Sequence, residues 1–229
     1  MDLSERYLKN KASISDEDQA VLKASRVGII GFGGLGERVA ELLVRAGVGR
    51  LAIAEFDRFE ASNLNRQLFS TEQNLGQSKL EVGYKHLLEI DSSVSLELID
   101  RRIDETNAET LLAGCDCVVD CLDNAPSRKV AVDACQALDV PLVHGAVAGW
   151  RGRIAVIRPG SRLAGVFGGG SAKGVEMATG NPSPTVATAA ALQAAETLKL
   201  LLGKDEDDGI ERIIEFDLLA LSFDSIDFS

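Results

Sequence analysis

Basic side chains are scarce in this sequence. The chain has 229 residues, with 24 Lys and Arg against 35 Asp and Glu, which gives a formal net charge of -11. A nucleic acid is usually held through clustered Lys and Arg that contact its phosphates. The deficit therefore argues against a nucleic-acid partner, and it fits a small ligand or a protein partner.

Long apolar runs are also missing. No stretch approaches the roughly 20 uninterrupted apolar residues of a membrane-spanning helix. The first 19 residues, MDLSERYLKNKASISDEDQ, are charged and lack the apolar segment of a secretory signal. We therefore expect no membrane partner and a cytoplasmic location.

Cysteines are few, and their spacing is not that of a zinc site. The four are Cys115, Cys117, Cys121 and Cys135, with no CxxC pair and no nearby histidine at ligand spacing. In CDCVVDC the alternation is typical of a strand that places Cys115, Cys117 and Cys121 on one face. We interpret these thiols as small buried hydrophobic groups.

Apolar, strand-like runs alternate with helical patterns from residue 26 onward. This alternation predicts one α/β domain with a Rossmann-like, mostly parallel sheet flanked by helices. Past residue 149 two strand patterns follow each other closely, which predicts an antiparallel C-terminal extension of the sheet. The expected parts are an N-terminal arm (1–25), a nucleotide-binding half (26–149) and a C-terminal part with antiparallel strands, a glycine-rich crossover loop (160–184) and a helix (150–229).

A glycine turn between the first strand and the first long helix is the first sign of a ligand. Gly31-Phe32-Gly33-Gly34-Leu35-Gly36 satisfies GxGxxG, and Glu55 ends the next strand. Such glycines let phosphate approach the backbone at the helix N-terminus, and the acid accepts hydrogen bonds from a ribose. The turn accepts NAD, FAD or ATP, so it predicts a nucleotide without naming it.

Charged residues after the later strands narrow the choice. The segment FDRFEASNLNRQ places Arg66 just beyond a strand, where ligands of open α/β sheets bind, and Lys79 begins the next helix. These cations suit a triphosphate better than a hydride donor. Asp123, in DCLDN, supplies a carboxylate suited to Mg²⁺. Together these residues predict an ATP–Mg²⁺ site.

With these motifs the sequence resembles a known family, the ThiF/MoeB/HesA adenylyltransferases, which are relatives of the ubiquitin-activating enzymes. The likeness covers nearly the whole chain, and SNLNRQ combined with DCLDN is its most specific part. The matching stretches are RYLKN (6–10), GFGGLG (31–36), AEFDRFEASNLNRQ (54–67), LGQSK (75–79), DCLDN (120–124), PLVHGAVAGWRGRI (141–154) and ALQAAETLKLLLG (191–203).

The resemblance implies that the enzyme adenylates the C-terminal Gly-Gly carboxylate of a small sulfur-carrier or ubiquitin-like protein and releases pyrophosphate. It implies a homodimer in which Arg6 reaches the γ-phosphate of the other subunit. Arg66, Lys79, Asp123 and Arg6 would be catalytic, and Asp123 would bind Mg²⁺. The ATP-binding residues it implies are Gly31, Gly33, Gly34, Leu35, Gly36, Glu55, Asp57, Asn63, Arg66, Gln67, Lys79, Leu122, Asp123 and Asn124.

The chain departs from this family in its cysteines. Many members bind zinc through two CxxC pairs, and some form a covalent bond to the carrier through a loop cysteine. Residues 150–229 contain no cysteine. We therefore expect no structural zinc, and an enzyme that stops at the adenylate. The loop 160–184 is expected to clasp the carrier tail.

Other interpretations stay open from the sequence alone. The same fold could adenylate a small carboxylate or a tRNA-linked acid. An NAD(P)-dependent oxidoreductase explains neither Arg66 nor Asp123, and a non-catalytic partner-binding module would not need them. Individually, Arg66, Lys79 and Arg6 could be surface charges, and Asp123 could cap the following helix. We expect packing or surface roles for His86, His144 and Trp150.

Overall fold

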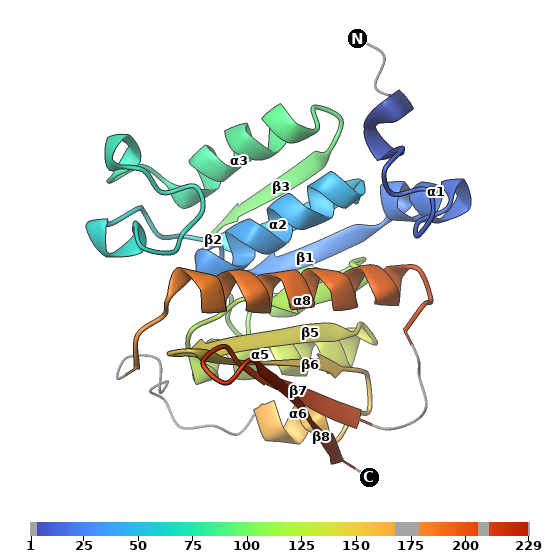
Figure 1. Ribbon diagram of the computed structural model, residues 1–229, viewed down its shortest axis with the longest axis vertical. Helices are drawn as coiled ribbons and strands as arrows, with labels where there is room; N and C mark the ends of the chain where they lie inside the picture. Colours follow the sequence, from blue (N-terminus) through green and yellow to red (C-terminus); the bar gives the residue numbers. More distant parts are fainter. Residues whose placement is uncertain (1–3, 168–178, 206–210, 229) are drawn as a thin grey trace.

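The computed structural model describes residues 4–167, 179–205 and 211–228. Within them one sheet has the strand order β3-β2-β1-β4-β5-β6-β7-β8 (Figure 1). The first five strands in the chain pair in parallel, and β6, β7 and β8 are added antiparallel, so the predicted fold class is confirmed. The strands are β1 (Arg26–Ile30), β2 (Arg50–Glu55), β3 (Ser95–Asp100), β4 (Cys117–Asp120), β5 (Leu142–Ala148), β6 (Arg151–Ile157), β7 (Glu211–Asp217) and β8 (Ser222–Phe228).

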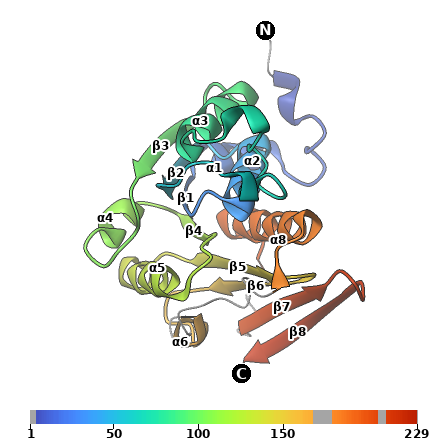
Figure 2. The same cartoon turned by 90° about the vertical axis from the view of Figure 1, so that its left-hand side faces the viewer.

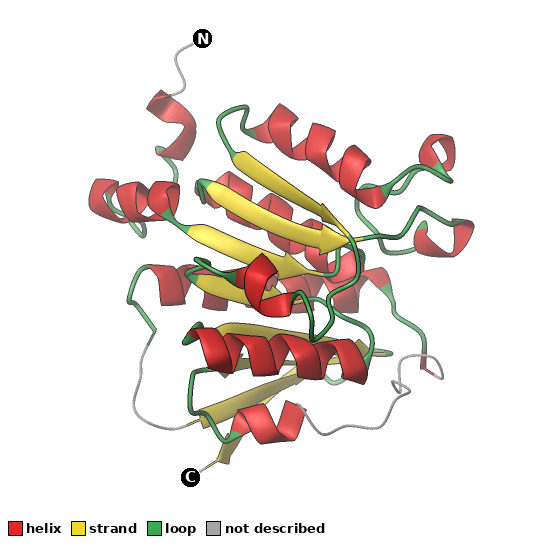
Figure 3. Ribbon diagram, turned by 180° about the vertical axis from the view of Figure 1, so that it is seen from behind, coloured by secondary structure: helices red, strands yellow, loops and turns green. Residues whose placement is uncertain are grey.

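Helices cover both faces of the sheet (Figure 2). Helices α2 (Gly34–Ala46), α3 (Lys79–Ile90) and α8 (Ser183–Leu201) share one buried apolar cluster with β1 and β4. Helices α4 (Ala108–Leu112), α5 (Ala125–Leu138) and α6 (Leu163–Phe167) share a second apolar cluster on the opposite face. Figure 3 shows the molecule with this face of the sheet towards the viewer. In the described part of the chain, no helix combines the length and apolar character needed to cross a membrane.

The N-terminal arm is more ordered than its polar sequence indicates. It contains a 3-10 turn (Ser4–Tyr7) and helix α1 (Asp16–Ala24). Ser15 and Asp18 form a reciprocal cap at the start of α1: each backbone N–H donates to the other's side chain, at 3.1 and 2.8 Å. Leu22 is fully buried in the main core, which anchors the helix. With only one buried residue, α1 has no apolar periodicity from which a helix could be predicted.

Helices α2 and α3 each bury one apolar stripe and leave a neighbouring large side chain exposed. Val39 and Leu43 of α2 are fully buried, but Leu42 is 38% exposed. In α3, Leu87 is buried while Tyr84 is 39% exposed. Both exceptions lie at the margin of a stripe with a period of 3.6 residues, where the helix surface turns towards solvent.

Three of the four cysteines are buried, as expected for small apolar groups. Burial raises the pKa of Cys115 to about 11 and that of Cys135 to about 12, so both stay protonated. The prediction of one shared face was wrong. Strand β4 begins only at Cys117, so Cys115 lies before it and packs into the opposite cluster, while Cys117 and Cys121 pack on the other side.

The region after β5 differs from the prediction in one place. Trp150 lies in the tight turn between β5 and β6 and is 43% exposed, within the packing or surface roles expected for it. The predicted loop 160–184 contains α6, whose Leu163 and Phe167 are buried. Residues 168–178 of that loop lie outside the described residues, and its role towards a carrier tail stays a prediction.

Candidate active site

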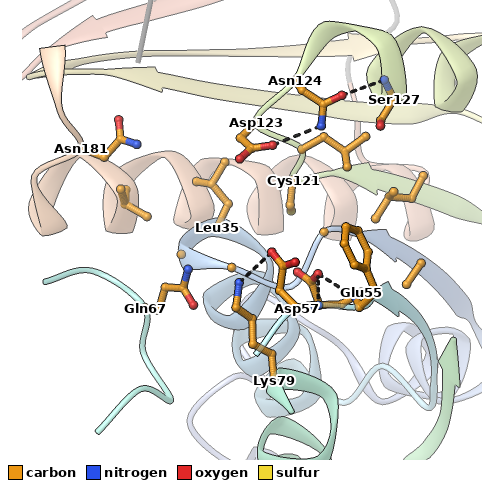
Figure 4. A pocket seen from close by; sticks show the side chains of 18 of the residues that line it. Leu35, Glu55, Asp57, Gln67, Lys79, Cys121, Asp123, Asn124, Ser127 and Asn181 are labelled. Atoms are coloured by element: carbon orange, nitrogen blue, oxygen red, sulfur yellow. Dashed lines mark hydrogen bonds and ion pairs between the residues drawn. The ribbon is translucent and has the colours of Figure 1, made fainter. Parts of the chain in front are cut away.

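A pocket of about 710 Å³ opens at the carboxyl ends of β1, β2, β3 and β4 (Figure 4). Parallel strands bring residues far apart in the sequence to this edge of the sheet. Twelve of the fifteen residues predicted for the site line the pocket: Gly31, Gly33, Gly34, Leu35, Glu55, Asp57, Arg66, Gln67, Lys79, Leu122, Asp123 and Asn124.

Two glycines of the turn are required because the chain approaches itself too closely there for a side chain. Gly31 has a φ of +88°, and a Cβ there would lie 2.7 Å from the carbonyl oxygen of Cys121. At Gly36 a Cβ would lie 2.0 Å from the Gly31 oxygen, so this glycine packs the helix onto the strand instead of lining the pocket. Helix α2 follows N-cap Gly33, which has no side-chain cap, so its first N–H groups remain for an anion.

Glu55 ties the end of β2 to this turn. Its Oε2 accepts a hydrogen bond from the N–H of Phe32 at 2.8 Å. Its Oε1 accepts from the N–H groups of Phe56 and Asp57, at 2.8 and 3.0 Å. Three of the roughly four acceptor positions of a carboxylate are therefore used by the backbone. The predicted contact to a ribose stays a prediction, and Glu55 also orders the turn.

Basic side chains gather in the pocket of this acidic chain. Its lining contains the four cations Arg66, Lys79, Arg101 and Arg102, against the three acids Glu55, Asp57 and Asp123. Lys79 is buried, and its ammonium lies 3.4 Å from Oδ2 of the half-exposed Asp57. A pocket with this balance suits a polyanionic ligand.

Asp123 does not cap helix α5. Its neighbour Asn124 does so, because the Asn124 Oδ1 accepts from the N–H of Ser127 at 3.0 Å (Figure 4). The Asp123 side chain stays exposed in the pocket and accepts a hydrogen bond from Asn124 Nδ2 at 3.2 Å. The capping alternative for Asp123 is therefore wrong, and its carboxylate faces the ligand space.

Two other predicted residues lie away from the pocket lining. Asn63 is buried in the loop after β2, where its Oδ1 accepts from the N–H of Glu60 at 3.0 Å. Arg6 lies 2.5 Å from Oδ2 of Asp91, at the far end of α3. Burial alone would raise the pKa of Asp91, but Arg6 and Ser93 lower it to about 2. Contacts of Asn63 and Arg6 with a nucleotide stay predictions.

The sequence profile that describes the ThiF family matches residues 6–229. The chain belongs to the ThiF family. Similar proteins include the SAMP-activating enzyme E1 of Haloferax volcanii, 32% identical over 94% of this chain and 81% of that protein. The molybdopterin-synthase adenylyltransferase of Escherichia coli is 33% identical over 90% of this chain and 84% of its own length. The predicted family and enzyme class, an adenylyltransferase, are thereby confirmed.

Solved structures agree with the ThiF-family fold. The crystal structure of Escherichia coli MccB with ATP has a TM-score of 0.82 at 21% identity, covering 98% of this chain and 71% of that chain. The structure of PaaA has a TM-score of 0.79 at 17% identity, covering 97% and 82%. At these identities the likeness shows the fold alone.

Some residues that line the pocket of this ThiF-family chain were not predicted from its sequence. Arg101 and Arg102 directly follow β3, and the rule that ligands bind beyond strand ends would have found them. The guanidinium of Arg102 lies 5.0 Å from the centre of the Phe56 ring. Asn181 lies just before α8 and Val186 in its first turn, and no local pattern places that helix against the glycine turn.

The two histidines are held by packing, as expected. His86 packs against Phe69, with ring centres 4.4 Å apart. His144 is fully buried, and its Nδ1 lies 2.7 Å from Oδ2 of Asp120. Neither residue lines the pocket.

A buried acid, Glu37, lies in the first turn of α2. Its Oε2 accepts from the N–H of Phe69 at 2.9 Å, while its Oε1 has no partner. Burial chiefly raises the pKa of Glu37 from 4.5 to about 8, although Phe69 and Lys79 act in the opposite direction. Glu37 is therefore protonated in the folded protein near neutral pH and ionised in the unfolded chain.

Glu37 should make the fold less stable as the pH rises. Between pH 4.5 and about 8 the folded state holds a proton that the unfolded state has lost. The free energy of unfolding should then fall by up to about 1.4 kcal/mol per pH unit through this group. In Glu37→Gln the amide oxygen still accepts from Phe69, and this contribution should disappear. Urea unfolding of both proteins at pH 5.5 and 7.5 checks it; parallel pH profiles would contradict it.

Proposed function

We propose that this chain adenylates the C-terminal carboxylate of a small sulfur-carrier or ubiquitin-like protein that ends in Gly-Gly. The observation that carries the proposal is the meeting of Arg66, Lys79 and Asp123 with an uncapped helix N-terminus in one pocket. A hydride donor requires no such set of cations and carboxylate. The names of the relatives support the substrate class: one activates SAMP, and another, from Thermus thermophilus, is a sulfur carrier protein adenylyltransferase, 41% identical over 62% of this chain and 53% of that protein.

The residues suit Mg²⁺ as the accompanying metal. Mg²⁺ is usually held by one or two carboxylates together with phosphate oxygens and water. Asp123 and Asp57 both line the pocket, and among the described residues no group of three or more His, Cys, Asp or Glu is placed to hold a metal ion. This donor set fits a metal brought in with the nucleotide. When bound, the metal would neutralise phosphate charge.

In the proposed reaction the carrier carboxylate attacks the α-phosphorus of ATP, an acyl–phosphate bond forms, and pyrophosphate leaves. In-line displacement of this kind depends mainly on positioning and charge neutralisation. The N–H groups of α2, Arg66 and Lys79 would hold the phosphates, and Asp123 the metal. Burial raises the pKa of the pocket residue Cys121 well above its usual range, which does not suit a nucleophile. Residues 150–229 also contain no cysteine that could form a covalent bond to the carrier, so the reaction would stop at the adenylate.

The proposal includes a homodimer and a cytoplasmic location. Arg6 would have to exchange its ion pair with Asp91 for a phosphate of the neighbouring subunit. Light scattering should then give a dimer at micromolar concentration, and a monomer would count against this part.

ATP–pyrophosphate exchange tests the proposed function. We expect exchange in the presence of a carrier protein ending in Gly-Gly, and none with the same carrier truncated by its last two residues. Tight ATP binding without exchange for any carrier would contradict the proposal and favour a small carboxylate or a tRNA-linked acid as substrate.

A further inference from the structure

Three polar residues are buried beneath the turn that carries Asp123. Asp120 ends strand β4 and is fully buried. Its Oδ2 accepts from Arg128 Nε at 2.9 Å and from His144 Nδ1 at 2.7 Å. Arg128 comes from α5 and His144 from β5, and they are 9% and 0% exposed. We call Asp120, Arg128 and His144 the Asp120 cluster.

The Asp120 cluster holds both backbone groups of Leu122. The Leu122 N–H donates to Asp120 Oδ1 at 3.0 Å, and its carbonyl oxygen accepts from Arg128 Nη2 at 2.9 Å. The Asp120 carbonyl oxygen in turn accepts from Gln193 of α8 at 2.8 Å. Leu122 directly precedes Asp123, so the direction in which Asp123 leaves the backbone depends on these bonds.

Asp120 is ionised and His144 is neutral in this cluster. Burial would raise the pKa of Asp120, but His144 and Arg128 hold it below its ordinary value, so Asp120 is ionised. Burial lowers the pKa of His144, which is therefore neutral near pH 7 and donates from Nδ1. Its ring packs against Phe167, with ring centres 4.2 Å apart.

Burying an ion pair is an expensive way to stabilise a core. Well-packed apolar residues of similar volume are often equally or more stabilising. The planar guanidinium of Arg128 gives something that apolar residues cannot give, because one edge binds a carboxylate while another nitrogen binds the Leu122 carbonyl. The cluster therefore provides directed hydrogen bonds at a site where the position of Asp123 matters.

We propose that Asp120 and Arg128 are positioning residues for metal–nucleotide binding, because they fix the Leu122 backbone and so aim Asp123 at the metal. His144 holds the Asp120 carboxylate in the required orientation. The inference rests on the proposed function in that Asp123 faces a nucleotide-bound metal. Neither Asp120 nor Arg128 would touch ATP or the carrier.

Arg128→Lys tests the inference most sharply. Lysine keeps the positive charge, but its single ammonium group lacks the fork that reaches both Asp120 and the Leu122 carbonyl. Calorimetry would measure binding of ATP with Mg²⁺ and of ATP in EDTA to the full chain. We expect affinity for Mg²⁺–ATP to fall about 10–100-fold, as for other residues that orient metal ligands. Affinity for metal-free ATP should stay unchanged.

Thr197→Val is the matched control. Thr197 is fully buried in α8 and donates to the Gln193 carbonyl at 2.8 Å, with no bond to the Asp123 turn. It should leave both affinities unchanged. Asp120→Asn is the second variant, to be used if thermal unfolding shows that Arg128→Lys does not fold, and the same loss confined to Mg²⁺–ATP is expected.

Three results would overturn the inference. They are unchanged Mg²⁺–ATP affinity in the folded variant, an equal loss of affinity with and without Mg²⁺, and failure of both variants to fold, which would show that the cluster serves stability. A wild-type chain that binds Mg²⁺–ATP tightly but shows no exchange with any carrier would contradict the proposed function and leave this inference standing.

Discussion

Lys79→Met is expected to slow carrier-dependent ATP–pyrophosphate exchange by about 10²–10³-fold, the usual effect of removing one group that stabilises developing charge. The Lys79 residue is 5% exposed, and its ammonium reaches the pocket beside Asp57. Methionine keeps most of the aliphatic length of the side chain and removes the charge. The loss should therefore appear in catalysis, with the fold intact.

Lys85→Met on the same helix α3 is the control for Lys79. Lys85 is exposed and does not line the pocket. Its replacement should leave the exchange rate unchanged, and circular dichroism should show both variants folded. Equal exchange rates for Lys79→Met and the wild type would mean that this cation is not part of the site.

Asp123→Asn should also reduce exchange by about 10²–10³-fold, because a bound metal contributes several kcal/mol of charge stabilisation. Asparagine preserves the size of the side chain but is a weaker ligand for Mg²⁺. Asp123 is exposed and caps no helix, so the substitution should not lower the free energy of unfolding. The decisive measurement is the Mg²⁺ dependence of exchange, which should shift to higher concentration.

Asp133→Asn is the control for loss of a negative charge outside the pocket, on the helix that follows Asp123. Asp133 is exposed on α5, where it pairs with Lys129 at 2.5 Å and does not line the pocket. We expect a normal Mg²⁺ dependence for this variant. A normal Mg²⁺ dependence in Asp123→Asn as well would remove Asp123 from the metal site.

Much of the fold could be predicted because its strands are short, apolar and bounded by clear turn or helix signals. β1 begins at Arg26 and β2 ends at Glu55, both as predicted, and the change to antiparallel pairing after β5 followed from the short connection at residues 149–150. Helix α1 was missed because its stability comes from the Ser15–Asp18 cap and one buried leucine. The exposure of Trp150 depends on tertiary packing that no local pattern contains.

Some residues of the candidate site could be predicted from the sequence, and others could not. Residues that directly follow strands, such as Glu55 and Asp123, were found because parallel strands place their carboxyl ends at one edge of the sheet. Asn181 was not found, because it reaches the pocket only through the packing of α8 against α2. The role of Asp120 was hidden for a related reason: its partner Arg128 looks like an ordinary helix residue until α5 is placed over β4.

Transfer of the adenylyl group of ATP, which contains the α-phosphorus, to the carrier is the most direct test of the proposed adenylation. The chain would be mixed with ATP labelled at the α-phosphorus, Mg²⁺ and a carrier ending in Gly-Gly. We expect the label to become attached to the carrier as an acyl-adenylate. In a parallel reaction with ATP labelled at the γ-phosphorus, the label should leave as pyrophosphate, and Lys79→Met should suppress both. A carrier that gains no α-label while ATP is bound would contradict the proposed adenylation.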